Sequence, residues 1–370
     1  MRKYWNRKNI SDLKSTNREK QMINRGAYFS NFCIELTKKC NIRCRHCILD
    51  AQETHNMELG WPVIKRLIKE AAVLGDIKEI GFVGGEPFLE LDTLINAVNL
   101  CKMLGMKASV VTNGSWAFSE EKAKKILEKL RGLTTLCVST DTFHQEFVSI
   151  DRIRNVILSC HELGIDCDVY FCHLNDPVSE IEALKKQLAG VEGLYNLKHQ
   201  PVVFLGRAAT QIDINSLYSY DTRGQFCYSV DNPLVNSNGN VVACCGGAVI
   251  WPGNHPLQLG NIHYQTLDEI RKAADLNPII HALRLWGPNE LVHLVQKQVE
   301  REGYSFNQPP MDEIWNLCLL CKYIVANLDH AELLRRVAKD PEVYHNIAAV
   351  RLIELAEISM LLEEGNLDCE

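Results

Sequence analysis

The segment NFCIELTKKCNIRCRHC, residues 31–47, joins a β-rich run to three closely spaced cysteines. Cys40, Cys44 and Cys47 are separated by three and then two residues, and no fourth cysteine follows nearby. A structural zinc site normally takes four protein ligands. A four-iron cluster held by three thiolates instead keeps one iron free for another ligand. The spacing therefore favours an iron-sulfur site with one open iron.

From about residue 33 to residue 205, short β-rich runs alternate with amphipathic helical runs. The expected strands are 31–37, 77–85, 107–114, 134–140, 166–171 and 197–206, and the expected helices are 61–75, 91–105, 119–132, 150–164 and 180–190. This alternation predicts an α/β fold with a parallel sheet, either open or rolled into a full or partial barrel. In both cases the active site belongs at the C-terminal ends of the strands.

Polar loops follow the strands at the predicted active-site edge. GGEP (84–87) follows the second strand, TNG (112–114) the third and STD (139–141) the fourth. His144 comes shortly afterwards, and its position suits a structural role as well as a substrate contact. Because the ends of parallel strands meet at one rim, we expect these loops and the three cysteines to form one site.

The composition is that of an ordinary globular protein. Of 370 residues, 46% are hydrophobic and 23% are charged, and the net charge of −6 gives no general case for nucleic-acid binding. No apolar run approaches the length needed to span a membrane. The basic start MRKYWNRKN lacks the apolar core of a signal peptide, so we expect a cytoplasmic location. The 15 cysteines are then expected as metal ligands, catalytic thiols or buried residues rather than disulfides.

The three-cysteine loop and the GGEP motif together resemble the radical S-adenosylmethionine (SAM) superfamily over roughly residues 33–206. One departure is His46, where the family usually has an aromatic residue before the third cysteine; its ring still offers a flat face. The resemblance implies a partial (β/α)6 TIM-like barrel and a [4Fe-4S] cluster bound by Cys40, Cys44 and Cys47. SAM would bind the open iron and be cleaved reductively to a 5′-deoxyadenosyl radical.

The resemblance also implies which residues bind SAM. Gly84 and Gly85 would let the backbone approach the methionine part of SAM, and Glu86 or its neighbouring carbonyls would take the ammonium group. Ser139 would lie near the ribose, unless it is a strand-end cap. Arg207 would pair with the SAM carboxylate or bind substrate, unless it is a solvated surface cation.

A second set of cysteines lies beyond the predicted barrel, at Cys227, Cys244, Cys245, Cys318 and Cys321. The layout resembles the SPASM/Twitch extensions of radical SAM enzymes, in which a hairpin ends in G-x4-C. Four of these thiols would hold a second, auxiliary [4Fe-4S] cluster without an open iron. A structural zinc bound by the same four thiols is the alternative.

The CC doublet leaves one thiol in surplus. If Cys227, Cys244, Cys318 and Cys321 bind the cluster, Cys245 is free at its edge and could give a hydrogen atom to a substrate radical. In the alternative register, Cys245 is the cluster ligand and Cys244 is buried.

These features predict four parts of the chain: an N-terminal extension, the radical SAM partial barrel, a SPASM/Twitch-like module with a small cysteine-rich β-hairpin and helices, and C-terminal helices. Their expected bounds are 1–32, 33–210, 211–325 and 326–370.

Three function classes follow from the resemblance. The favoured one is a peptide-modifying enzyme that abstracts hydrogen from a ribosomally made peptide, with L-to-D epimerisation through Cys245 as the favoured outcome. Thioether or carbon-carbon cross-linking of the peptide is the alternative outcome. The second class is oxidation of a small alcohol such as a cyclitol or sugar, and the third is a non-enzymatic iron-sulfur protein. The enzyme classes imply a reductant such as flavodoxin or ferredoxin, and neither nucleic acid nor membrane is an expected partner.

Overall fold

A computed structural model describes residues 28–55, 57–217, 227–251, 255–303, 316–341, 343–345 and 348. The framework is one sheet with the strand order β6-β5-β4-β3-β2-β1-β7-β8-β9. The strands are β1 (Asn31–Thr37), β2 (Glu79–Gly84), β3 (Lys107–Thr112), β4 (Leu133–Ser139), β5 (Asp166–His173), β6 (Asn196–Pro201), β7 (Leu234–Val235), β8 (Asn240–Val242) and β9 (Gln258–Asn261). Strands β1 to β6 pair in parallel with their chain neighbours, so the predicted parallel α/β architecture is confirmed.

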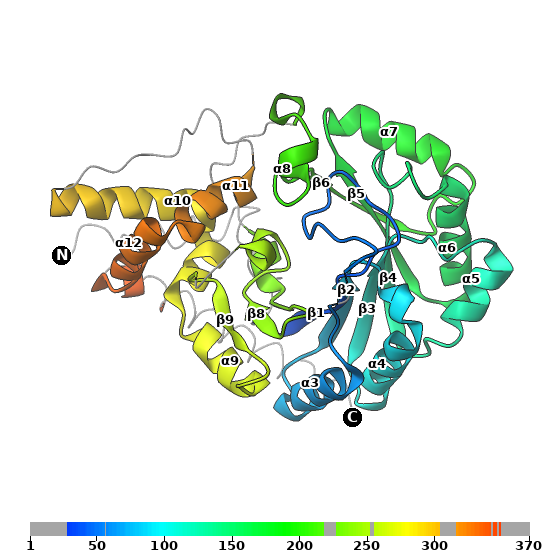
Figure 1. Cartoon of the computed structure of the whole chain (residues 1–370), viewed down its shortest axis with the longest axis horizontal. Helices are drawn as coiled ribbons and strands as arrows, with labels where there is room; N and C mark the ends of the chain where they lie inside the picture. The colour runs from blue at the N-terminus through cyan, green and yellow to red at the C-terminus, as the bar shows by residue number, and fades with distance from the viewer. Residues whose placement is uncertain are drawn as a thin grey trace, which may run out of the picture.

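Helices follow the strands in the predicted alternation and lie along the outer side of the curved sheet (Figure 1). They are α3 (Trp61–Leu74), α4 (Leu91–Met103), α5 (Glu120–Leu127), α6 (Ile150–Leu163) and α7 (Pro177–Gln187). The remaining helices are α8 (Ala208–Gln211), α9 (Leu267–Asp275), α10 (Pro278–Glu302), α11 (Leu317–Cys321) and α12 (Leu328–Ala338). The strand-helix repeat therefore places the loops after β1 to β6 at one rim of a partial barrel.

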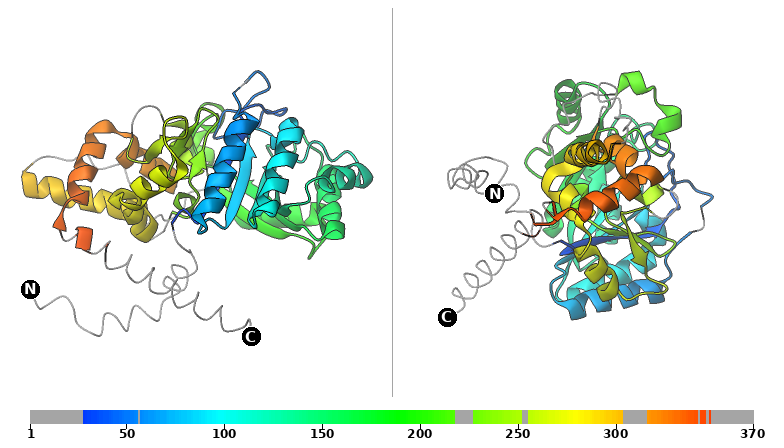
Figure 2. Two further views of the ribbon diagram at one scale, coloured as in Figure 1. Left: turned by 90° about the horizontal axis from the view of Figure 1, so that it is seen from below. Right: turned by 90° about the vertical axis from the view of Figure 1, so that its left-hand side faces the viewer.

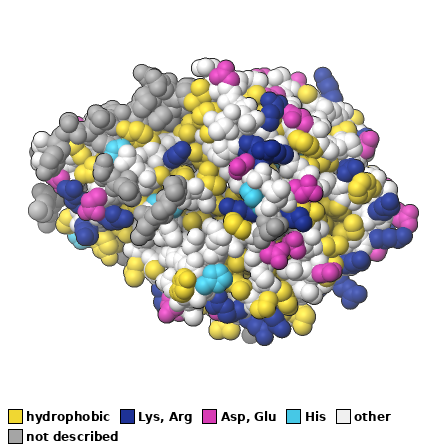
Figure 3. Space-filling view, in the orientation of Figure 1, with side chains coloured by type: hydrophobic (Ala, Val, Ile, Leu, Met, Phe, Trp, Pro, Cys, Tyr) yellow, Lys and Arg dark blue, Asp and Glu magenta, His cyan; other side chains and the backbone are white. Residues whose placement is uncertain are grey.

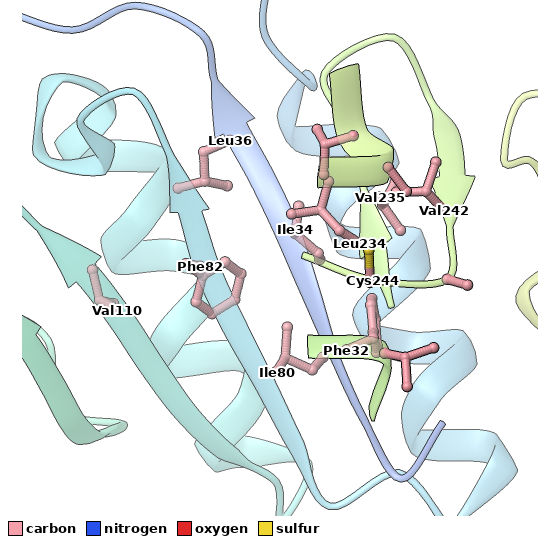
Figure 4. Packing of buried hydrophobic residues seen from close by; sticks show 14 of the residues in the cluster. Phe32, Ile34, Leu36, Ile80, Phe82, Val110, Leu234, Val235, Val242 and Cys244 are labelled. Carbon is pink, nitrogen blue, oxygen red and sulfur yellow. The ribbon is translucent and has the colours of Figure 1, made fainter. Parts of the chain in front are cut away.

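Strand β1 separates the apolar core from the inside of the barrel. Phe32, Ile34 and Leu36 are buried and pack with residues of β2 on the helix-covered face (Figure 4). Side chains of successive strand residues point to opposite faces. Cys33 accordingly lies on the inner face, where it lines a cavity.

The predicted C-terminal hairpin extends the barrel sheet. Strand β7 pairs in parallel with β1, with Cys33 opposite Leu234, and the Cys33 N–H donates to the Pro233 carbonyl at 2.7 Å. Strands β8 and β9 continue the sheet in antiparallel pairs. An edge strand exposes unpaired backbone groups, and β7 covers this edge of β1 at Cys33 and Ile34. The hairpin is therefore joined to the barrel by backbone hydrogen bonds.

Helices α10, α11 and α12 form a cluster on the hairpin side of the molecule, away from β5 and β6 (Figures 1 and 2). The Arg284 side chain is buried there, and its Nε donates to Asp231 Oδ1 at 2.7 Å. Most of the predicted N-terminal extension, and the predicted C-terminal helices beyond residue 348, lie outside the described residues.

The described helices include none with both the length and the apolar character that a membrane crossing requires. Lysines and arginines are interspersed with acidic side chains over the face shown in Figure 3.

Two glycines at the end of β2 pack directly against the chain that leaves β1. A Cβ atom added to Gly84 would lie 2.4 Å from the Thr37 oxygen, and one added to Gly85 would lie 2.1 Å from the Lys39 oxygen. Gly84 also has a φ of 146°, which other residues rarely adopt. These glycines therefore allow the end of β2 to approach the backbone that leads into the three-cysteine loop, and their predicted approach to SAM stays a prediction.

We predict that Gly85→Ala destabilises the protein by about 1–3 kcal/mol, because the added methyl group overpacks the backbone of Lys39. Gly60→Ala is the matched control: Gly60 is exposed and an added Cβ has no neighbour closer than 3.7 Å. Because Gly60 is the N-cap of α3, where Gly is favoured over Ala, its effect on the free energy of unfolding should stay below about 1 kcal/mol. Denaturant unfolding of the two variants checks this, and equal stability would contradict the close approach.

Candidate active site

A cavity of about 590 Å³ lies inside the partial barrel and opens at the rim that carries the three-cysteine loop. This volume is typical of small-molecule and cofactor sites. The predicted site residues that line it are Cys40, Cys44, Cys47, Gly84, Gly85, Ser139 and Cys245, and His144 joins them. Glu86 and Arg207 are absent from this lining. Most of the residues predicted to bind the cluster or SAM in the barrel therefore line one cavity, whereas Glu86 and Arg207 lie outside its lining.

The three-cysteine loop presents its thiols to this cavity. Cys40 and Cys44 are buried and Cys47 is half-buried. Burial, and to a lesser extent the charges of Glu86, Cys47 and Cys44, raise the pKa of Cys40 to about 12. Three soft thiol donors that meet at a cavity with room for a further ligand suit a cluster with one open iron.

Arg207 holds the three-cysteine loop from behind. Its guanidinium group donates to the Cys44 carbonyl at 2.9 Å, to the Ala51 carbonyl at 2.5 Å and to Asp50 Oδ1 at 2.8 Å. Its backbone N–H donates to the Cys47 carbonyl at 2.9 Å. The side chain is buried, so the alternative of a solvated surface cation is wrong. Its three donor nitrogens bond to the loop, and this geometry indicates that Arg207 positions the cysteines.

Glu86 is buried beneath the rim. Its carboxylate accepts hydrogen bonds from Thr112 Oγ1 at 2.7 Å, from the Phe88 N–H at 3.1 Å and from the Asn113 N–H at 2.8 Å. Burial raises the pKa of Glu86 to about 7, despite these hydrogen bonds. In this geometry the carboxylate orients Asn113 rather than facing the cavity.

Asn113 is a cavity residue that sequence reasoning did not single out. Its side chain donates to Asn41 Oδ1 at 3.1 Å and lies 3.8 Å from Cys40 Sγ. The available signal was its place in the TNG loop after the third predicted strand. An amide at this position connects the third loop of the rim to the three-cysteine loop.

His46 and His144 share one carboxylate beside the cysteines. His144 Nδ1 lies 2.9 Å and His46 Nε2 lies 3.4 Å from Asp141 Oδ2. The His46 ring stacks on Phe143 with a centroid distance of 4.7 Å, as expected for a flat ring before the third cysteine. Burial opposes the charge on His144, but the pairing with Asp141 raises the pKa of His144 to about 10. His144 thus both lines the cavity and has a structural partner.

The second set of thiols gathers at the hairpin and α11. Burial raises the pKa of Cys244 and of Cys318 to about 12, and the charges of Cys227, Cys244 and Cys318 all act on Cys321. Asn316 caps α11, and residues three apart on a helix share a face, so Cys318 and Cys321 point the same way. Cys244 lies among buried apolar side chains near Leu234 (Figure 4).

Cys245, unlike Cys244, lines the cavity inside the barrel. Cys245 is exposed, whereas Cys244 is buried among apolar side chains. Which of the two joins Cys227, Cys318 and Cys321 stays a prediction.

Residues 34–188 match the family model described as Radical SAM superfamily. The chain contains a radical SAM domain. The matched region runs from β1 to α7, and the hairpin and the helices that follow lie beyond it. Members of this superfamily use a [4Fe-4S] cluster and SAM, as the three-cysteine loop predicted.

Two relatives of known sequence are similar to this chain over different lengths. A putative peptide biosynthesis protein, YydG of Bacillus subtilis (strain 168), is 22% identical over 302 residues, which cover 80% of this chain and 91% of that protein. A probable GTP 3′,8-cyclase of Methanothermobacter thermautotrophicus is 28% identical over 141 residues, which cover 36% of this chain and 44% of the cyclase.

Similar solved structures include Streptococcus suis SuiB bound to S-adenosylmethionine, with 15% identity, a TM-score of 0.46 and coverage of 72% of this chain and 69% of SuiB. BtrN in complex with AdoMet and 2-DOIA has 16% identity, a TM-score of 0.44 and coverage of 72% of this chain and 91% of BtrN.

For the radical SAM domain we predict that Arg207→Met lowers iron retention, because the change removes the donors of two buried loop carbonyls. Each unpaired carbonyl costs about 1–3 kcal/mol. Iron content after anaerobic reconstitution and gel filtration measures the effect.

The control for this prediction is Arg335→Met, which removes an exposed ion pair with Glu332 worth less than about 1 kcal/mol. Full iron loading of Arg207→Met together with weakened SAM binding would instead favour the sequence-based prediction that Arg207 contacts SAM.

Proposed function

We propose that this protein is a radical SAM enzyme that modifies a ribosomally made peptide, and that it converts an L-residue to a D-residue. The observation that carries the proposal is the divergence of two neighbouring thiols. Cys244 is buried among apolar side chains, whereas Cys245 lines the barrel cavity. A thiol in that cavity can reach a substrate radical there.

The cofactors divide between two proposed parts of the chain. In the barrel, residues 33–210, Cys40, Cys44 and Cys47 would hold a [4Fe-4S] cluster whose open iron binds SAM. The cluster and SAM together would supply a radical that can abstract an unactivated hydrogen atom. The protein would orient the substrate and exclude water. In residues 211–325, the four clustered thiols would hold an auxiliary [4Fe-4S] cluster.

The residues around SAM have separate tasks in this proposal. Gly84, Gly85, Asn113 and Ser139 line the cavity and would contact SAM directly. Their backbone and side-chain groups can take the amino acid and ribose parts of SAM. Glu86 and Arg207 would act one layer further out, by holding Asn113 and the three-cysteine loop in place.

The proposed reaction at the substrate needs only a hydrogen atom from the protein. Abstraction of the α-hydrogen leaves a planar carbon radical on the peptide. The Cys245 S–H bond breaks and a new C–H bond forms on the opposite face, which inverts the residue. No electron leaves the substrate, whereas a cross-link or an oxidised alcohol requires one to do so.

The peptide substrate is supported by the similarity to YydG, which extends over 91% of that protein and past the radical SAM domain of this chain. The enzyme would draw electrons from a low-potential carrier such as flavodoxin or ferredoxin. We place it in the cytoplasm, where its free thiols would stay reduced.

We predict that the reconstituted protein binds about eight irons per chain, in two four-iron clusters. The combined change of Cys40, Cys44 and Cys47 to Ala should leave about four irons and abolish formation of 5′-deoxyadenosine. Iron analysis and chromatography of the nucleoside products measure both. Continued 5′-deoxyadenosine formation by the triple variant would refute the assignment of these cysteines.

For the peptide reaction we predict that turnover in deuterated water adds about one mass unit to the product, because the Cys245 thiol exchanges with solvent before it delivers its hydrogen. Cys245→Ala should keep both clusters and lose the D-product, and Cys244→Ala should lose the auxiliary cluster. Cys137→Ala is the control, since Cys137 lines the same cavity from β4.

The peptide encoded by a short reading frame beside the gene is the substrate to test. Mass spectrometry and chiral analysis of its hydrolysed residues give the readout. A product lighter by two hydrogens, formed normally by Cys245→Ala, would exclude epimerisation and would favour a cross-link or an alcohol oxidation.

A further inference from the structure

The three-cysteine loop has an inward face and an outward face. Four alternate residues are buried or half-buried and line the barrel cavity: Cys40, Ile42, Cys44 and His46. The residues between them, Asn41, Arg43 and Arg45, are exposed and absent from that lining. Arg43 and Arg45 are the chain neighbours of Cys44. The outward face is therefore the molecular surface next to the proposed cluster, and it carries two arginines.

The loop after β3 borders this outward face. Asn41 Nδ2 donates to Ser115 Oγ at 2.8 Å, which joins the three-cysteine loop to the loop after β3. The Ser115 carbonyl accepts a hydrogen bond from the Arg152 guanidinium group. That group also lies over the Phe118 ring, 4.1 Å from the ring centroid. A third arginine and an aromatic ring thus extend the outward face.

The loop after β4 forms a second border. Arg45 Nη2 donates to Glu146 Oε1 at 2.6 Å, and Phe147 follows Glu146 in the chain. Phe147 is 46% exposed, and Phe118 at the first border is 64% exposed. Aromatic and arginine side chains are enriched where proteins contact one another. Six residues make up what we call the outer patch: Asn41, Arg43, Arg45, Phe118, Phe147 and Arg152.

The outer patch carries positive charge that is only partly neutralised. Arg45 is paired with Glu146, but no carboxylate in the described part of the chain forms an ion pair with Arg43 or Arg152. The chain as a whole has a net charge of −6. An acidic protein is therefore repelled by the molecule as a whole and attracted at this patch. Such a charge distribution orients an acidic partner before contact.

We propose that the outer patch is the docking surface for an acidic electron-carrier protein, which supplies the electron for SAM cleavage. This inference rests on the proposed cluster at the three cysteines, and it adds the surface at which the proposed carrier binds. SAM and substrate would occupy the cavity side of the cluster, so the carrier would approach from the outward face. One electron would pass from carrier to cluster, which oxidises the carrier and reduces the cluster by one electron each.

The charged and apolar parts of the outer patch would have different effects. Arginines at the rim of a contact mainly change the rate of encounter and its salt dependence. Exposed charges are screened beyond about 10 Å at 0.1 M salt. The phenylalanines would instead exclude water from the contact, and their contribution persists at high salt. The expected signature is an association that weakens, without disappearing, as salt rises.

The first test measures binding without electron transfer. An oxidised acidic flavodoxin and an oxidised acidic ferredoxin are titrated separately into the anaerobically reconstituted protein by calorimetry at low salt. Arg43→Glu should weaken binding about tenfold, because charge reversal replaces an attraction with a repulsion. The carrier whose binding responds identifies the physiological type.

The matched control is Lys185→Glu, which changes the net charge by the same amount. Lys185 is exposed in the last turn of α7, where the chain has run back from the rim towards the start of β6. Its carrier binding should equal that of the unaltered protein. At high salt the loss in Arg43→Glu should also disappear, because the charges are then screened.

The second test concerns the apolar part of the patch. Phe118→Ala should weaken carrier binding at low and at high salt alike. Met103→Ala is the control, since Met103 is 81% exposed at the last residue of α4, away from the rim. Its carrier binding should be unchanged.

The third test follows the electron. The reduced carrier is mixed rapidly with the reconstituted protein, and absorbance records oxidation of the carrier. Arg43→Glu should slow this transfer about tenfold or more at low salt. With dithionite, a small reductant that needs no docking surface, Arg43→Glu should form 5′-deoxyadenosine from SAM at the rate of the unaltered protein.

The outcomes separate this inference from the proposed function. Carrier binding that is equal in Arg43→Glu, Phe118→Ala and the unaltered protein would overturn the docking surface, as would failure of both carriers to bind the unaltered protein. Equal slowing with carrier and with dithionite would place the defect at the cluster and would also overturn it. Failure of the proposed cluster would show instead as continued 5′-deoxyadenosine formation by the triple cysteine variant, and failure of epimerisation as a product lighter by two hydrogens.

Discussion

The site depends on hydrogen bonds that hold the backbone of the three-cysteine loop from two sides. Arg207 donates to the Cys44 and Ala51 carbonyls, and the N–H groups of Gly85 and Glu86 donate to the Thr37 and Lys39 carbonyls at 2.8 Å. A loop without regular structure must otherwise leave buried carbonyls unpaired. These bonds keep three thiols aimed at one cavity, and the pair of glycines follows from the close contact that the bonds require.

The second constraint is the continuity of the sheet from barrel to hairpin. Because β7 is hydrogen-bonded to β1, the chain after β8 is fixed relative to the barrel interior. Cys244 is buried among apolar side chains, and Cys245 lines the cavity. Two adjacent residues thus have different proposed tasks: Cys244 would bind the auxiliary cluster, and Cys245 would donate a hydrogen atom.

Two charged residues have structural contacts that the sequence does not reveal. The family resemblance implies that Glu86 and Arg207 contact SAM, and those contacts stay predictions. In the fold, both are buried and bonded to backbone groups that shape the rim. Arg207 reaches a loop 163 residues earlier in the chain, as measured to Cys44. No local pattern reports such a contact, so only the placement of both segments at one rim reveals it.

The sequence by itself determined the chemical class and the architecture, because both are written in short-range patterns: the spacing of Cys40, Cys44 and Cys47, and the alternation of strand and helix periods. The second group of thiols was visible for the same reason. Only the tertiary structure placed Cys245 at the barrel cavity and Cys244 among the buried apolar side chains. These choices depend on which face of the sheet each residue occupies, and that is set by pairing between strands far apart in the chain.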